Sequence, residues 1–105
     1  MTGPLSDVTI LDLTSVISGP LATSILGDQG ARVIKVESPN GDSMRMAGAI
    51  NGGVSSLFSS INRNKESIAL DLRKPEAIEI INKIAARADI CIQNYRPGVV
   101  EKLGI

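Results

Sequence analysis

The sequence predicts an open α/β sheet of the Rossmann-like type, mostly parallel and flanked by helices. Short β-branched and apolar runs alternate with amphipathic segments along the 105 residues. The links between these segments are short, which favours right-handed strand–helix–strand units. Phe58 and Tyr95 are the only aromatic residues, so the core must be built from aliphatic side chains, as in a sheet covered by helices.

A strand, a helix and a second strand are expected first, at residues 8–13, 20–26 and 31–36. Residues 8–13 are β-branched and apolar, which is typical of a buried strand. Pro20 suits the first helical position, with Ser18 or Gly19 as the cap. Gly30 is well placed to end the helix in a left-handed conformation.

The middle of the chain changes character, because turn-forming residues and glycines fill residues 38–56. We expect a long surface loop there, which ends in a short helix over residues 54–61. Strand, helix, strand and a last short helix then follow, at residues 67–72, 75–88, 90–93 and 98–103. Apolar residues at i, i+3 and i+4 spacing support the helix that Pro75 opens.

Composition excludes several classes of function. Eleven cations balance eleven carboxylates, so no global field attracts nucleic acid or an anionic membrane. The chain has no histidine, which removes histidine acid–base catalysis and most transition-metal sites, and we expect no metal. It shows neither a signal peptide nor an apolar run of membrane-spanning length, so a cytoplasmic location is expected. Cys91 lies in an apolar run and is interpreted as a buried structural thiol.

Ligands of open α/β sheets bind at the carboxyl ends of the strands. The first candidate there is the turn at residues 15–20, where a helix N-terminus offers free N–H groups to an anion; an ordinary capped turn is the alternative. A dinucleotide site is disfavoured, although Glu37 ends the second strand where a ribose-binding acid would lie. The G-x-G-x-x-G pattern is absent, and Pro20 lacks the N–H that a pyrophosphate would need.

Two further stretches carry suitable chemistry. Residues 62–65 and the pair Arg73 and Lys74 flank the third strand with four cations, which suits phosphate; a solvated loop is the alternative. Residues 93–98 offer an amide, a stacking ring and a planar cation for an adenine with a nearby phosphate, or they form a simple strand-to-helix turn. Structural or solvated roles are expected for the remaining carboxylates, which show no spacing of a catalytic dyad: Asp12, Asp28, Asp42, Asp71 and Asp89.

Taken in order, these stretches resemble the N-terminal part of the family III CoA-transferases, the CaiB/BaiF type. The similarity covers nearly the whole chain with near-family spacing, although any single piece is weak. The segments that carry it are 4–5, 8–14, 19–23, 26–37, 40–42 with Arg45, 62–65, 67–72, 88–89 and 94–99.

The resemblance implies that the segment binds coenzyme A. Family positions that contact it match Val16, the stretch Leu70, Asp71, Leu72 and Arg73, and then Asn94, Tyr95 and Lys102. Arg45 and Lys65 lie in matched basic segments, and Ser18, Arg63 and Arg96 complete the expected set. Ser38 stands where family members often carry an arginine that contacts the cofactor, and Ser15 and Ile17 depart from the formyl-CoA transferase branch.

The family mechanism, by the same resemblance, transfers CoA from an acyl-CoA to a carboxylic acid through an aspartyl intermediate. That aspartate is expected beyond residue 105, so the chain is interpreted as one truncated CoA-binding domain, inactive alone. The related α-methylacyl-CoA racemases share the pattern and are not separated from it. A homodimer is implied for the full-length family. A non-catalytic CoA or nucleotide-binding module, or a small self-associating domain, remain alternatives.

Overall fold

The computed structural model describes residues 3–48, 50–52 and 54–105. Four strands form a parallel sheet in the order β5-β2-β1-β6: β1 (Thr9–Asp12), β2 (Arg32–Glu37), β5 (Lys65–Ala69) and β6 (Ile90–Ile92). The predicted open parallel α/β class is therefore confirmed. Of the segments discussed above, positions 1, 2, 49 and 53 lie outside the described residues.

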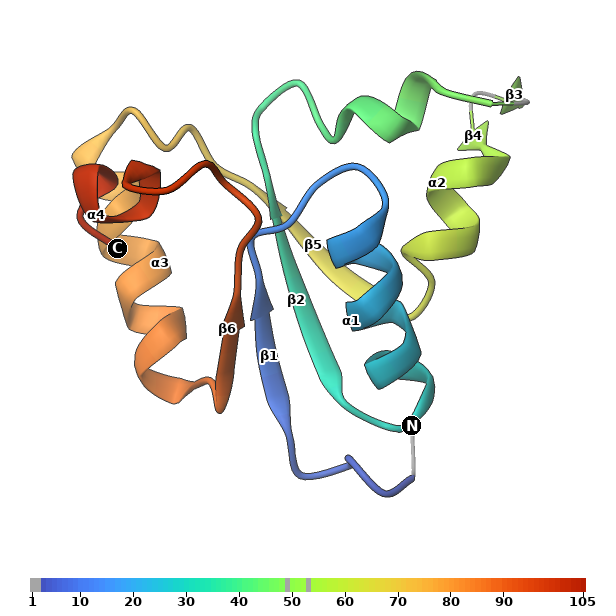
Figure 1. Cartoon of the computed structure of the whole chain (residues 1–105), viewed down its shortest axis with the longest axis horizontal. Coiled ribbons are helices and arrows are strands. Elements are labelled where there is room, and N and C mark those ends of the chain that lie inside the picture. Colours follow the sequence, from blue (N-terminus) through green and yellow to red (C-terminus); the bar gives the residue numbers. More distant parts are fainter. Residues whose placement is uncertain (1–2, 49, 53) are drawn as a thin grey trace.

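Helices cover both faces of this sheet (Figure 1). Helix α1 (Ser18–Asp28) lies on one face, and helices α3 (Pro75–Arg87) and α4 (Val99–Leu103) lie on the other. Alternate residues of β1 divide between the two layers, as the two-residue period of a strand requires. Leu11 packs with Ile81 of α3, whereas Ile10 packs with Leu26 of α1.

Helix α1 approaches the chain just before it very closely. A Cβ atom on Gly19 would lie 2.4 Å from the Thr14 Cβ, which no side chain tolerates. The helix begins at Ser18, two residues before the predicted start, and its Ile17 N-cap makes no side-chain cap hydrogen bond. Pro20 still fits, because the first N–H groups of a helix have no partner within it.

The predicted loop over residues 38–56 contains more regular structure than the sequence indicated. It holds a 3₁₀ helix η1 (Ser43–Met46) and a short hairpin of β3 (Ile50–Asn51) and β4 (Val54–Ser55). Helix α2 (Ser56–Ile61) follows directly. Side chains cap both helices, since Asp42 accepts from the Met44 N–H and Ser55 accepts from the Phe58 N–H. Glycine-rich turn chemistry hid the 3₁₀ helix and the hairpin, whereas a short helix had been expected over residues 54–61.

The third long strand was expected over residues 67–72 but runs over Lys65–Ala69. Strand β5 pairs only with β2, from Val33 opposite Lys65 to Glu37 opposite Ala69. Because β2 ends at Glu37, pairing stops there. Hydrophobic pattern alone did not reveal that Lys65 belongs to the strand.

The expectation that Cys91 is buried is wrong, because its side chain is exposed. Its strand β6 is an edge strand of the sheet and pairs only with β1. Edge strands are covered less completely than central ones, so an apolar run at an edge does not guarantee burial. Among the described residues, no helix is both long and apolar enough to pass through a lipid bilayer.

Ile81 is the apolar centre on which α3 depends. Its side chain is fully buried against Leu11, Leu13 and Val36. Replacement by alanine, Ile81→Ala, is expected to lower the free energy of unfolding by about 2–5 kcal/mol, because it removes apolar contacts and leaves a cavity. Urea unfolding followed by circular dichroism measures this. Ile80 is 39% exposed on the same helix, so Ile80→Ala is the matched control; equal losses in both variants would contradict this packing.

Candidate functional site

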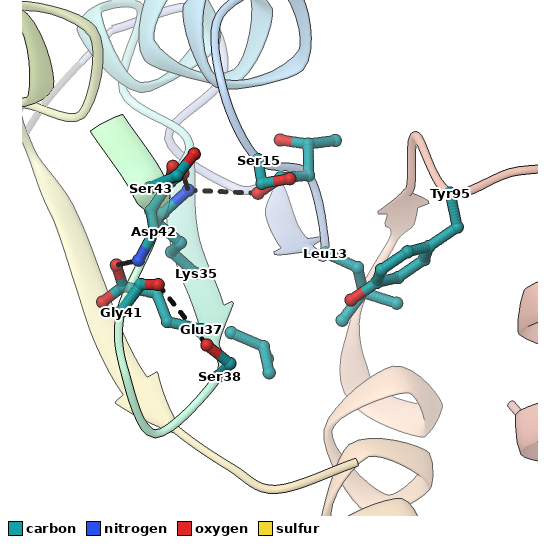
Figure 2. A pocket seen from close by; sticks show the side chains of 11 residues that line it. Leu13, Ser15, Lys35, Glu37, Ser38, Gly41, Asp42, Ser43 and Tyr95 are labelled. Carbon is teal, nitrogen blue, oxygen red and sulfur yellow. Dashed lines mark hydrogen bonds and ion pairs between the residues drawn. The ribbon is translucent and has the colours of Figure 1, made fainter. Parts of the chain in front are cut away.

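A cavity of about 270 Å³ lies at the carboxyl ends of β1 and β2. Thr14 and Ser15 of the turn after β1 form one wall, and Glu37 and Asp42 of the segment after β2 form another. Tyr95, from the turn after β6, extends its ring toward the space between them (Figure 2). This is the edge where ligands of open parallel sheets bind.

A second cavity of about 360 Å³ adjoins the first. The two share Val36, Glu37, Ser38 and Tyr95 in their linings. Beyond these shared residues the second cavity is lined by the segment after β5, which runs from Leu70 to Arg73. We call the two together the edge groove. Leu70 to Arg73 and Tyr95, which the sequence selected, therefore line the same cavity, and Tyr95 lines both cavities.

Cations gather at the far end of the edge groove. Arg73, Lys74 and Lys102 line a third cavity, of about 380 Å³, which shares Leu72 and Arg73 with the groove. The Arg73 side chain is 88% exposed and pairs with Asp71 across 2.9 Å. Hydrogen bonds from Arg73, followed by its charge, lower the pKa of the Asp71 carboxyl to about 2. The linings of the second and third cavities at this end thus contain three cations, Arg73, Lys74 and Lys102, and one carboxylate, Asp71.

Asn94 lies at the opposite end of the edge groove and forms hydrogen bonds with the turn after β1. Its side-chain amide donates to the Ser15 carbonyl at 2.8 Å and accepts from the Ser15 N–H at 3.2 Å. Val16 next to it has a φ of 73°, a left-handed conformation that costs a β-branched residue roughly 1–3 kcal/mol. Ser18, the first residue of α1, is exposed beyond this turn.

Tyr95 and Arg96 occupy the turn between β6 and α4. Burial raises the pKa of the Tyr95 phenol, and its ring packs against the core beneath α3. Arg96 is exposed, and its carbonyl accepts the Val99 N–H at the start of α4. The ring thus forms a fixed apolar wall between the two cavities, with a cation beside it on the chain.

Lys65 was expected to meet a phosphate, but its ammonium is already fully paired. Its side chain is 2% exposed, and Nζ lies 3.1 Å from the Asp12 carboxylate. It also donates to the Pro20 carbonyl and the Asn62 side chain, at 3.0 and 2.8 Å. The strand shift places Lys65 under α1, where only a paired charge can be buried. The structure therefore gives it a structural role.

Arg63 lies at the wrong edge of the sheet for the groove. It precedes β5, and in a parallel sheet the residues before a strand lie at the amino edge. Its guanidinium pairs there with Asp28, at the end of α1. The four cations that were expected to act together are thus separated. Arg63 lies at the amino edge and Lys65 under α1, and only Arg73 and Lys74 reach the groove region.

Arg45 is close to the groove but is paired with Glu37, which lines it. It forms two hydrogen bonds with the Glu37 carboxylate, at 2.8 and 2.7 Å, and stacks over the Phe58 ring at 4.0 Å from its centre. Burial, the largest influence, would raise the pKa of Glu37. Donation by Arg45 and by the Ser67 hydroxyl outweighs it and lowers the pKa to about 2.

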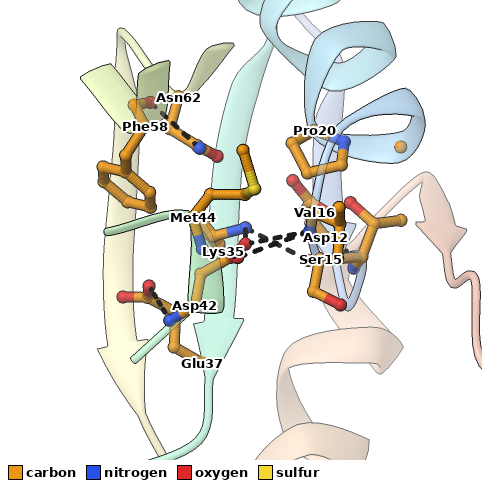
Figure 3. Close-up of polar contacts among 12 residues, drawn as sticks. Asp12, Ser15, Val16, Pro20, Lys35, Glu37, Asp42, Met44, Phe58 and Asn62 are labelled. Atoms are coloured by element: carbon orange, nitrogen blue, oxygen red, sulfur yellow. Dashed lines mark hydrogen bonds and ion pairs between the residues drawn. The ribbon is translucent and has the colours of Figure 1, made fainter. Parts of the chain in front are cut away.

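Sequence reasoning missed the buried pair of Lys35 and Asp42. Both side chains are 1% exposed, and Lys35 Nζ lies 3.0 Å from Asp42 Oδ2 (Figure 3). The signal was present, because a lysine at the centre of the apolar strand over residues 32–37 cannot be buried without a partner. Asp42, interpreted as a structural or solvated carboxylate, is that partner and lines the groove.

Within the described residues, no three histidine, cysteine, aspartate or glutamate side chains converge in a way that could hold a metal ion. The fold and the groove define a Rossmann-like α/β domain whose candidate ligand site lies at the carboxyl edge. The site is bordered by buried ion pairs at one end and by a group of cations, including the exposed Arg73, at the other.

Comparison with known proteins names the family. The family model described as "CoA-transferase family III" matches residues 5–105, and the chain belongs to this family. It is 47% identical to a human succinyl-CoA:glutarate CoA-transferase, over 97% of this chain and 24% of that protein. It is 44% identical to an acetyl-CoA:oxalate CoA-transferase of Acetobacter aceti, over 97% of this chain and 26% of that protein.

Solved structures of the same family resemble this chain in fold. A crystal structure of a CAIB/BAIF family protein from Brucella suis superposes with a TM-score of 0.92 and 35% identity, over 100% of this chain and 29% of that one. The chain thus spans about a quarter of the length of the curated relatives that it matches. The resemblance stated from the sequence motifs is confirmed.

The depressed pKa of Glu37 predicts a pH dependence. Because the carboxyl titrates at about 2 when folded and near 4.5 ordinarily, its stabilising contribution is complete above pH 4.5 and is lost as the pH falls toward 2. Urea unfolding of the protein and of Glu37→Gln from pH 7 to pH 2.5 tests this. The stability difference between the two is expected to shrink below pH 4.5; a difference that stays constant would contradict it.

Proposed function

We propose that this chain is the CoA-binding N-terminal domain of a CoA-transferase that moves CoA between an acyl-CoA and a carboxylic acid. The observation that carries the proposal is the edge groove, which runs from the turn after β1, past Tyr95, to Arg73. The adjoining third cavity adds the cations Lys74 and Lys102. Coenzyme A is long, and it is anionic at one end and neutral at the other. The charges along the groove change in the same way.

The phosphates belong at the cationic end. Arginine and lysine side chains bind phosphate by charge-assisted hydrogen bonds, and Arg73 is 88% exposed and free to turn toward a ligand. Its present partner Asp71 is also near the surface, so exchanging that carboxylate for a phosphate has a small cost, because surface ion pairs are weak. Arg96, in the exposed turn after Tyr95, adds positive charge on the β6 side.

The neutral pantetheine arm belongs at the other end, beside the turn after β1. The cations there, Lys35 and Arg45, are already paired with Asp42 and Glu37. A phosphate placed there would gain little from cations that are already paired, whereas an amide-containing arm meets backbone groups and the Tyr95 ring. The adenine, which CoA carries beyond its diphosphate, then lies on the cationic side, near Leu72, which lines both the second and the third cavity.

Catalysis is assigned to residues outside this chain. No residue among 1–105 is proposed as the aspartate that forms the acyl intermediate. We therefore expect the chain alone to bind CoA without turning it over. The racemase reaction, which uses the same N-terminal domain, remains the second candidate. A cytoplasmic location and a homodimer of the full-length protein complete the proposal. The apolar side chains exposed on α1, Leu21 and Ile25, support association with further protein surface.

Loss of the cations at the far end should weaken CoA binding. The double variant Arg73→Ala/Lys102→Ala is expected to bind CoA at least about tenfold more weakly, because two charge-assisted contacts to phosphate are removed. Isothermal titration calorimetry with CoA, and with NAD as a comparator, measures this. Arg63→Ala at the amino edge is the matched control, and it should bind CoA as the unaltered protein does. Equal losses in the control would refute the assignment.

A further inference from the structure

The turn after β1 is strained and yet firmly held. Val16 adopts a φ of 73°, which β-branched residues rarely adopt, so the surroundings must impose it. Side chains from three separate segments bind its backbone. Asp12 accepts the Thr14 N–H at 2.9 Å, Asn94 binds both backbone groups of Ser15, and Asp42 accepts the Val16 N–H.

Asp42 contacts the strained residue itself. Its two carboxylate oxygens lie 3.4 and 3.3 Å from the Val16 nitrogen. The same carboxylate receives Lys35 Nζ at 3.0 Å, and that ammonium also donates to the Thr14 carbonyl at 3.1 Å. Lys35 and Asp42 therefore hold the turn at two points, one carbonyl and one N–H. Figure 3 shows Lys35 and Asp42 facing Val16.

The position of Asp42 is fixed in turn by the end of β2. The Asp42 N–H donates to Glu37 Oε1 at 3.0 Å, and the Asp42 side chain accepts the Met44 N–H at the start of η1. Arg45 closes the segment by its two hydrogen bonds to Glu37. The segment from Glu37 to Arg45 thus fixes the position of the Asp42 carboxylate beneath the turn that lines the groove.

Fold stability alone is a poor explanation for this pair. Replacing a buried ion pair by apolar residues of similar size is often neutral or stabilising, because the charges no longer have to be desolvated. What apolar residues cannot supply is an acceptor for the Val16 N–H and a donor for the Thr14 carbonyl. Both groups belong to the turn that borders the groove.

We propose that Asp42, neutralised by Lys35, is a positioning residue that presets the turn after β1 for the pantetheine end of CoA. The inference rests on the CoA-binding function proposed above. Lys35 cancels the charge of Asp42, so that a carboxylate can hold the turn without repelling an anionic ligand nearby. Asp42 itself touches no substrate; it acts through the backbone of Val16.

The test replaces the pair and probes the two ends of the groove separately. The double variant Lys35→Met/Asp42→Leu removes both charges together, so no uncompensated ion remains buried. Arg32→Met/Glu66→Leu introduces the same two apolar residues into an ion pair whose partners are both exposed, and it is the control. Each protein is titrated with CoA and with adenosine 3′,5′-bisphosphate, which lacks the pantetheine arm. Circular dichroism checks that each variant is folded.

The double variant is expected to fold, to bind the bisphosphate as the unaltered protein does, and to bind CoA about tenfold more weakly. The control should bind both ligands normally. Three results would each overturn the inference: unchanged CoA affinity, equal loss for both ligands, or loss of folded structure in the double variant. If the unaltered protein binds neither ligand, the proposed function fails first, and this inference fails with it.

Amide hydrogen exchange gives a readout that needs no ligand. In Asp42→Asn the side chain keeps one oxygen acceptor but loses the charge that pairs with Lys35. The Val16 amide is expected to exchange at least about tenfold faster than in the unaltered protein, while the Ile10 amide in the centre of the sheet keeps its protection. Equal acceleration at both amides would show general loosening and would count against a positioning role.

Discussion

A lysine lies in the middle of a buried strand, and the rest of the site follows from the need to pair it. Lys35 lies on the same face of β2 as Val33 and Glu37, and α1 covers that face. An unpaired ammonium is not tolerated there. Its partner Asp42 comes from the segment immediately after the strand, so that segment must fold back across the edge of the sheet. By doing so it builds a wall of the groove and reaches the turn after β1.

The requirement that buried charges be paired also applies to the charged residues near Lys35, and it explains how charge is distributed along the groove. Asp12 and Lys65 pair beneath α1, and burial of Asp12, which would raise its pKa, is outweighed by hydrogen bonds from Thr14 and Thr23 that lower it. The charges near the turn after β1 are therefore internally balanced. At the other end Arg73 is exposed and pairs only with Asp71 near the surface, so it can exchange that partner for a ligand at small cost.

The sequence was sufficient for the sheet and its helices, because apolar periodicity directly reflects burial. Positions set by pairing partners were less predictable. The start of β5 depends on which residues of β2 lie opposite, so Lys65 was assigned to a loop. Arg63 was assigned to the ligand edge of the sheet, although it lies at the amino edge. Leu72, Arg73 and Tyr95 were selected from strand ends and resemblance, and they do line one groove. The lysine within the apolar strand at residues 32–37 signalled that Lys35 needs a partner, but identifying Asp42 as that partner required the fold.

The central claim is that coenzyme A lies along the carboxyl edge of the sheet. Mapping of amide chemical shifts by NMR while CoA is added tests it most directly. The account predicts that the largest changes fall on Ser15, Leu72, Arg73 and Tyr95, and that Arg63 and Asn64 at the amino edge stay unchanged. Changes centred on the amino edge, or spread evenly over the domain, would contradict it.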